Sequence, residues 1–232
     1  MDTNPYISDS LNIAEIFKGF TDEQSAGLLK KGLPIKLPAG RILFHQGDPA
    51  TSCFLVNRGC LKLTKLNEQG KEVILRYIGV GEMAAAITLL KGWDYPVTAQ
   101  SIEETEVTGW DKPTMIQLMH QYPDMAINLL GIVLARIADV QDRYLEVCTE
   151  RVDQRIARSL LRLMRRAGVK TGSGIQIDIP LSRQNIADYS GTTLYTVSRT
   201  LSAWEKIGWI KSKREQIVIT DPHALVQFAE NG

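Results

Sequence analysis

The sequence predicts an α+β protein with an N-terminal antiparallel β domain, a long helix and a C-terminal winged helix–turn–helix. Three observations lead to this fold. Short apolar runs separated by glycine turns fill residues 34–110, and a helical apolar repeat fills residues 112–148. The last third of the chain then alternates helix and strand patterns in the order of a winged helix. We therefore expect domains at residues 1–111, 112–149 and 150–232.

The composition is that of an ordinary globular protein, with 44% hydrophobic and 23% charged residues. No apolar run reaches the ~18 residues of a membrane span. The first residues, MDTNPYISDSLNIAEIF, have neither the basic start nor the apolar stretch of a secretory signal. Cys53, Cys60 and Cys148 are odd in number and lack metal-ligand spacing, which favours a reducing, cytoplasmic setting and no metal site.

Charge is unevenly distributed along the chain. Residues 150–232 contain 13 Lys and Arg against 8 Asp and Glu, a net charge of +5, whereas the rest of the chain has a net charge of −4. A polyanionic partner is therefore expected to bind the C-terminal third.

Two short helices are expected before the β domain. SLNIAEIFKGF and TDEQSAGLLKKG both have helical apolar spacing, and Thr21 is the expected N-cap of the second, with Glu23 in its first turn. In the β domain, glycines recur roughly every ten residues, which is typical of an antiparallel sandwich or barrel. NEQGKE is the expected tip of a hairpin, and VTAQSIEETEVTGW is expected to form two strands.

The long helix contains an apolar seam with a spacing of about 3.5 residues. Its members are Ile127, Leu130, Leu134, Ile137, Gln141, Tyr144 and Cys148. Such a stripe either packs on the β domain of its own chain or pairs with a second copy. We favour a homodimeric coiled coil, because the seam is long and no helical hairpin partner follows it.

The C-terminal third begins with an amphipathic helix, RVDQRIARSLLRLMRRAG, which ends at a glycine cap. GIQIDIP is the expected next strand. LSRQNIADYSG follows as a helix with Ser182 as its N-cap, and TTLYTVSRTLSAWEKIG as the helix after the turn. WIKSKREQIVIT reads as a two-stranded hairpin. Together these elements predict the winged helix–turn–helix.

Within this motif, Gly191 stands where a steep turn requires a positive φ. Leu194, Val197 and Leu201 are spaced to form the apolar stripe that faces the first helix. The remaining polar face is then free to enter a DNA major groove.

We expect Arg199 to bond guanine O6 and N7, and Ser198 to contact a base edge or a phosphate. The other predicted DNA contacts are polar or basic side chains around the same surface, most of them suited to the phosphate backbone. They are Thr193, Tyr195, Thr196, Arg183, Gln184, Lys211, Lys213 and Arg214.

The stretches GRILFHQGDPATSCFLVNRGCLKL, RIARSLLRL and SRQNIADYSGTTLYTVSRTL resemble the cAMP receptor protein / fumarate–nitrate reductase regulator (CRP/FNR) family of bacterial transcription factors. The resemblance covers nearly the whole chain. It implies a β-roll of the double-stranded β-helix or jelly-roll type that binds an effector, a dimerisation helix and a DNA-binding winged helix. It also implies a homodimer on a near-palindromic operator that recruits RNA polymerase.

The sequence departs from this family in its DNA-reading helix. The family's glutamate one turn before the arginine is replaced by Tyr195. Glutamate accepts a hydrogen bond from a cytosine amino group, whereas tyrosine cannot supply that charged acceptor. We therefore expect a shifted half-site sequence.

The effector loop GEMAAAITLLKGWDYPVTAQS departs from the family too. Ala86 stands where we expect the glutamate that binds the ribose of a cyclic nucleotide, and Pro96 or Val97 stands where we expect the arginine for the phosphate. A cyclic phosphate without its cation is costly to bury, so tight cAMP binding is not expected. The family's iron–sulfur branch needs about four thiolates, which three scattered cysteines cannot supply.

The same loop is rich in apolar residues. This bulk either fills the vacated space as core or lines a pocket for haem or a small organic effector, as in nitric-oxide-responsive relatives. The predicted lining is Met83, Ala86, Ile87, Leu90, Trp93, Tyr95 and Val97. His45, His120 and His223 are each expected to be structural or surface residues rather than haem ligands.

These observations predict an effector-responsive, homodimeric DNA-binding regulator. The alternative is a constitutive DNA-binding protein whose pocket is filled by its own side chains. An enzyme is not expected, because the sequence contains no nucleophile–base pairing, no GxxxxGK[ST] phosphate loop and no metal-ligand cluster.

Overall fold

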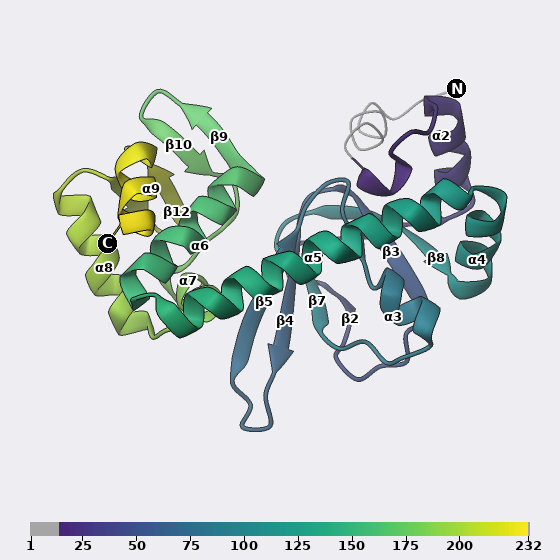
Figure 1. Cartoon of the computed structure of the whole chain (residues 1–232), viewed down its shortest axis with the longest axis horizontal. Helices are drawn as coiled ribbons and strands as arrows, with labels where there is room; N and C mark the ends of the chain where they lie inside the picture. The colour runs from purple at the N-terminus through teal and green to yellow at the C-terminus, as the bar shows by residue number, and fades with distance from the viewer. Residues whose placement is uncertain (1–13, 232) are drawn as a thin grey trace. The chain divides into compact units, whose positions relative to one another are not determined.

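The computed structural model describes residues 14–231. Packing divides the chain into two compact units, the first made of residues up to 71 together with 75–139, and the second of residues 72–74 together with those from 140 onward. Figure 1 labels the elements of both units. The division falls inside the long helix, so the last turns of that helix belong to the C-terminal unit.

Eight strands form two four-stranded antiparallel sheets, which confirms the predicted N-terminal β domain. The first sheet has the order β1 (Leu33–Leu37), β8 (Thr105–Asp111), β3 (Ser52–Arg58) and β6 (Met83–Ala84). The second has the order β2 (Ile42–Phe44), β7 (Thr98–Ser101), β4 (Leu61–Leu66) and β5 (Glu72–Ile78). The two strands predicted from VTAQSIEETEVTGW are β7 and β8. The hairpin tip predicted from NEQGKE joins β4 to β5, where Asn67 accepts backbone hydrogen bonds from Gln69 and Lys71.

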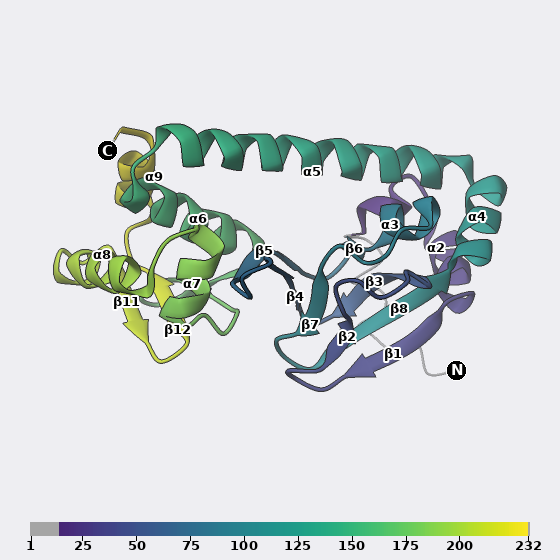
Figure 2. The same cartoon turned by 90° about the horizontal axis from the view of Figure 1, so that it is seen from below.

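Strand β3 shows why this domain has two cores. Successive side chains of a strand point to opposite faces, and in β3 both faces are buried. Cys53 and Leu55 pack into one apolar cluster, whereas Phe54 and Val56 pack into the other. The first cluster also receives side chains from the helices, and Figure 2 shows α3 and the first half of α5 on the same side of the sheets.

Helices frame this domain, beginning with the short 3-10 helix η1 (Glu15–Phe17) and α2 (Asp22–Lys30). Thr21 caps α2 as predicted, because its hydroxyl accepts from the Gln24 N–H while the Gln24 side chain accepts from the Thr21 N–H. Part of the first predicted helix lies outside the described residues. A short helix, α3 (Ala86–Lys91), follows β6 in the apolar loop.

The helical region predicted at residues 112–149 contains two helices, α4 (Lys112–Gln121) and α5 (Pro123–Thr149). The break falls at Tyr122, which has φ −133° and ψ 82°. Pro123 explains it, since proline disfavours the helical conformation of the preceding residue and is well suited to the first turn of a new helix.

Helix α5 buries one face and exposes another. Met125, Leu129 and Ile132 pack into the β-domain core. The predicted seam lies on the opposite side, where Leu130 and Leu134 are both 59% exposed and every other member of the seam is exposed as well. The alternative in which the seam packs on its own β domain is therefore wrong.

The C-terminal unit is the predicted winged helix–turn–helix, with two additional elements. Its helices are α6 (Val152–Ala167), α7 (Arg183–Ser190), α8 (Leu194–Lys206) and α9 (Pro222–Asn231). Its sheet has the order β11 (Ile210–Lys213), β12 (Gln216–Ile219), β10 (Gly174–Ile177) and β9 (Gly168–Thr171). Strand β9 and helix α9, which includes His223, were not predicted.

Two local expectations need correction. Gly168 ends α6 without the left-handed conformation of a glycine cap, since its φ is −85°. A Cβ at this position would lie 2.3 Å from the Met164 carbonyl oxygen, so glycine is required by close approach. Leu194 is 45% exposed at the start of α8, so it does not belong to the stripe that packs on α7.

Among the described residues, no helix is both long enough and apolar enough to cross a membrane.

Candidate nucleic-acid interface

The turn between α7 and α8 is built by three local signals. Ser182 caps α7, accepting from the Asn185 N–H at 3.0 Å, and Asn185 in turn accepts from the Ser182 N–H. Gly191 ends α7 with a φ of 66°, the left-handed conformation predicted for it. Thr193 begins α8, and its hydroxyl accepts from the Thr196 N–H at 3.2 Å. The sequence therefore fixes where both helices start.

Apolar contacts hold the two helices together. Ile186 and Ala187 on α7 and Val197 and Leu201 on α8 are all fully buried. Trp204 is buried one turn later on α8. Burial of these side chains is the main stabilising term for the motif, and it leaves the opposite face of α8 in solvent.

The exposed face of α8 contains the predicted base-reading residues. Tyr195 is 75% exposed, Arg199 is exposed, and Ser198 is half-buried between them and the core. Within the described chain, Arg199 makes no hydrogen bond or ion pair. Its five N–H donors are therefore available to a ligand.

Two of the predicted phosphate contacts are engaged inside the domain. The Arg183 guanidinium lies 3.6 Å from the Glu205 carboxylate and 3.4 Å from the Ser198 carbonyl oxygen. The Gln184 side chain donates to Asp188 at 2.8 Å. Arg183 thus links α7 to α8, a role that the sequence analysis missed.

The wing is tied to α8 by Glu205. Its carboxylate accepts from the Ser212 N–H at 3.1 Å and also from the Ser212 hydroxyl. Lys211 and Lys213 on β11 are exposed, as is Arg214 at the tip. The hairpin therefore presents its basic side chains in a fixed relation to the exposed face of α8.

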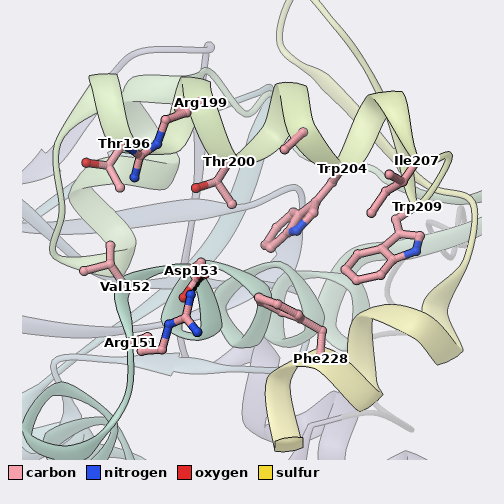
Figure 3. A pocket seen from close by; sticks show the side chains of 11 residues that line it. Arg151, Val152, Asp153, Thr196, Arg199, Thr200, Trp204, Ile207, Trp209 and Phe228 are labelled. Carbon is pink, nitrogen blue, oxygen red and sulfur yellow. Dashed lines mark hydrogen bonds and ion pairs between the residues drawn. The ribbon is translucent and has the colours of Figure 1, made fainter. Parts of the chain in front are cut away.

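A pocket of about 620 Å³ lies beside α8, on the side of α6 and α9. Its walls come from the start of α6, the length of α8, the residues after α8 and one aromatic of α9, as Figure 3 shows. Arg151, the N-cap of α6, lines this pocket together with Arg199. Arg151 is not among the site residues predicted from sequence, where its position before an amphipathic helix is the one signal that marks it.

The apolar residues predicted to line an effector pocket are divided between the two apolar clusters of the β domain, apart from Trp93. Met83 and Ala86 are buried in the cluster beneath the helices, whereas Tyr95 is buried in the other cluster of the β domain. Ile87 and Leu90 pack at the edge of the first cluster, and Val97 at the edge of the second. Trp93 is 62% exposed and lines neither. The buried residues of the predicted lining therefore belong to the hydrophobic core of the β domain.

An acidic residue at the start of the effector loop was not considered in the sequence-based prediction. Glu82, just before β6, binds the Arg76 guanidinium at 2.5 Å and accepts from the Gly79 N–H at 2.8 Å. The loop thus contains a carboxylate four residues before Ala86, and its charge is met by an arginine of the same domain.

The histidines are not placed to ligate a haem inside the β domain, and the two cysteines of this domain are core residues. His45, His120 and His223 are all exposed and none belongs to either core cluster. Cys53 and Cys60 are buried, and burial raises the pKa of Cys53 to about 12. The neutral thiol of Cys53 behaves as a small apolar side chain.

Comparisons with known proteins agree with this geometry. A model of the Crp-like helix-turn-helix domain matches residues 154–228, and a model of the cyclic nucleotide-binding domain matches residues 34–122. The transcriptional activator protein Anr of Pseudomonas aeruginosa is 31% identical over 87% of this chain and 82% of its own length. This chain belongs to the CRP/FNR family of transcriptional regulators.

Two further relatives match nearly the whole chain at lower identity. A CRP-like cAMP-activated global transcriptional regulator of Mycobacterium tuberculosis is 24% identical over 93% of this chain and 96% of its own. The fumarate and nitrate reduction regulatory protein of Escherichia coli is 26% identical over 89% and 82%. The regulator is thus a DNA-binding transcriptional regulator in which a domain of the effector-binding, cyclic nucleotide-binding type precedes the winged helix.

Solved structures agree on the fold. FixK2 from Bradyrhizobium japonicum has a TM-score of 0.74 at 23% identity, covering 85% of this chain and 96% of its own. A CooA mutant from Carboxydothermus hydrogenoformans has a TM-score of 0.74 at 20% identity, covering 99% and 97%.

Proposed function

We propose that the regulator acts as a homodimer that reads a near-palindromic operator through Arg199 and Tyr195 and recruits RNA polymerase in the cytoplasm. The observation that carries this proposal is the exposed face of α8, where Arg199 projects without a partner in the described chain. A planar guanidinium in this setting suits bidentate contact with guanine. Ser198, Thr193, Thr196 and the wing lysines then serve base edges and phosphates around it.

Tyr195 sets the sequence preference of this regulator. Its side chain is 75% exposed near the start of α8, and the N-terminal residues of a recognition helix reach base edges. A phenol offers an apolar ring to a thymine methyl group and a hydroxyl to a phosphate, but no carboxylate to a cytosine amino group. The operator therefore differs from that of relatives with glutamate at this position.

The exposed seam of α5 supports the homodimer. Leu130, Leu134 and Ile137 are 59%, 59% and 49% exposed, and Tyr144 is 73% exposed. Large apolar side chains in one stripe along a helix indicate an interaction surface. A two-fold axis along this stripe would pair each residue with its counterpart and present two α8 helices to half-sites about one helical turn of DNA apart.

The effector, in this proposal, is a small organic molecule other than cAMP that acts by shifting the population of DNA-binding conformers. The absence of an arginine at Pro96 or Val97 supports the exclusion of cAMP, because a cyclic phosphate would be buried without its cation. The second candidate function is a constitutive regulator. The burial of Met83, Ala86 and Tyr95 in the cores favours it.

Selection of binding sites from a random duplex pool, with the purified full-length protein, tests the proposal. We expect recovery of an inverted repeat that the protein binds as a dimer. Recovery of no preferred sequence would contradict the proposal. Affinity for the recovered duplex, measured with and without small molecules extracted from the host, separates the effector-responsive form from the constitutive one. Calorimetry with cAMP and a visible spectrum of the host-purified protein check the effector class.

A further inference from the structure

We propose that the pocket between the start of α6 and α8 is a second binding site for the DNA backbone, in which Arg151 binds a phosphodiester group. This inference deepens the proposed function and rests on it. It adds a contact on the side of α8 that faces away from the wing, where the sequence analysis expected none.

The chemistry of the pocket is divided between its two ends. Figure 3 shows Arg151, Asp153, Arg199 and Thr196 at one end, with Arg151 on the α6 wall and Arg199 on the α8 wall. The rings of Trp204, Trp209 and Phe228 gather at the other end. The first end thus has one arginine on each wall, and guanidinium groups suit an anion such as a phosphodiester group.

The aromatic end explains how the polar end keeps its shape. The ring centroids of Trp204 and Phe228 are 5.7 Å apart, and those of Trp209 and Phe228 are 5.6 Å apart. Contacts of this kind stabilise the packing of the elements that carry them. They join α8 to α9, and α9 packs on α6, where the Arg158 side chain donates to the Ala229 carbonyl oxygen at 3.0 Å. The two walls of the pocket are thereby held together.

The position of the pocket around α8 matches the geometry of a major groove. Residues of a helix advance by 100° each, so Thr196, Arg199 and Ala203 form one stripe of α8, and they line the pocket. Ser198 and Ser202 form another stripe, to which Arg183 binds. Tyr195 projects between the two stripes, so one basic group flanks it on each side.

A helix that fills a major groove has a phosphate backbone along both of its sides, because the groove is only about 12 Å wide. Arg183 and the wing lie on one side of the exposed face of α8. On the other side, the start of α6 faces the backbone, and Arg151 is the cation among the residues of this segment that line the pocket.

Arg151 is available for this contact in spite of its ion pair. It lies 2.9 Å from Asp153, but its side chain is 70% exposed. An exposed pair of this kind is weak, and one carboxylate leaves most of the five guanidinium donors free. Asp153 therefore orients Arg151 toward the pocket, while its negative charge opposes the approach of DNA.

The experiment measures the salt dependence of DNA binding by the full-length protein. The probe is a labelled random-sequence duplex of about 40 base pairs, which is long enough for two half-sites. Neutralising each phosphate contributes about 0.9 to the slope of log affinity against log salt. In a dimer of Arg151→Ala each protomer loses one phosphate contact, so we expect the slope to fall by about twice this amount. In Arg151→Lys the positive charge remains, so we expect most of the wild-type slope to be kept.

Lys170→Ala is the matched control. It removes one positive charge from the exposed strand β9, which does not line the pocket. We expect its slope to stay close to that of the wild type. If Arg151→Ala and Lys170→Ala have the same slope, or if Arg151→Ala leaves the wild-type slope unchanged, the phosphate site is wrong while the proposed function stands.

Two further variants separate a DNA contact from a structural role. Asp153→Asn removes the charge that opposes DNA, so we expect it to raise the affinity for the random duplex. If the Arg151–Asp153 pair were purely structural, Asp153→Asn would instead lower this affinity as much as Arg151→Ala does. Arg199→Ala is expected to weaken the selected duplex more than the random one, whereas Arg151→Ala weakens both by the same factor. Wild-type protein that binds no duplex would instead overturn the proposed function itself.

Discussion

Arg143 on α5 lies over the ring of Tyr189 on α7, with its guanidinium carbon 4.5 Å from the ring centroid, and one of its N–H groups donates to the Tyr189 hydroxyl. This contact joins the last turns of α5 to the first helix of the DNA-binding motif. In the same unit, Glu146 of α5 binds Arg162 of α6 at 2.6 Å. Polar contacts at the end of α5 thus reach both helices that support α8.

Removal of the Tyr189 hydroxyl tests the first of these contacts. Tyr189→Phe keeps the ring beneath Arg143 but loses the acceptor, and a hydrogen bond to a charged group contributes about 1.5–3 kcal/mol. We expect stability to fall by about that amount, and by more in Tyr189→Ala, which loses the ring as well. Urea unfolding at a fixed protomer concentration measures both. A Tyr189→Phe protein as stable as the wild type would show that the hydroxyl contributes nothing.

We expect Glu146→Gln to lower the stability of the protein more than Tyr189→Phe does. The Glu146 and Arg162 side chains are only 12% and 21% exposed. Burial opposes the charged form of Arg162, but Glu146 and Tyr189 more than offset this and raise the Arg162 pKa. Breaking a buried pair costs about 3–5 kcal/mol, and these side chains are slightly exposed, so we expect the lower end of that range. Glu150→Gln, which acts on Arg158 instead, is the matched comparison.

The buried thiol of Cys53 makes stability depend on alkaline pH. Its pKa rises from 9.0 in the unfolded chain to about 12 in the folded one. The group therefore stabilises the fold fully below pH 9.0, and this contribution is lost as the pH rises toward about 12. We expect the stability of the wild type to fall between these values more steeply than that of Cys53→Ala. Parallel unfolding curves for the two proteins would contradict this.

The fold could be predicted from sequence wherever one periodic pattern or one cap determined the local structure. The seam of α5, the Ser182 cap and Gly191 are examples, because spacing alone fixes the exposed face or the helix end. Side-chain partners distant in sequence were not predictable. Arg183 looked like a phosphate contact, yet Glu205 holds it at 3.6 Å from twenty-two residues away. Trp93 was predicted to line a pocket because it is hydrophobic, but hydrophobicity alone does not determine whether a side chain is buried, and Trp93 is exposed.

The exposed seam predicts that a single charge will separate the dimer. Leu134→Glu places a carboxylate in the middle of the stripe, where pairing would bury it, and an unpaired buried charge is unfavourable by several kcal/mol. Sedimentation should then report a monomer, and affinity for the operator should fall because two half-sites are no longer bound together. Ala135→Glu introduces the same charge on an exposed neighbour outside the seam and is expected to leave the dimer intact. A dimeric Leu134→Glu protein would contradict the proposed interface.

Tyr195→Glu is expected to change which base pair the regulator prefers. The substitution supplies the carboxylate that accepts from a cytosine amino group and removes the ring that packs on a thymine methyl group. We expect one position in each half-site to change toward C·G, with a discrimination of about 1–3 kcal/mol at that position. Competition between the two selected duplexes measures this discrimination. Tyr195→Phe, which keeps the ring, should retain the original preference, and a common preference in all three proteins would mean that residue 195 does not contact a base. Because Tyr195 is 75% exposed and contributes nothing to the buried contacts of α8, a changed preference would report on DNA recognition rather than on folding.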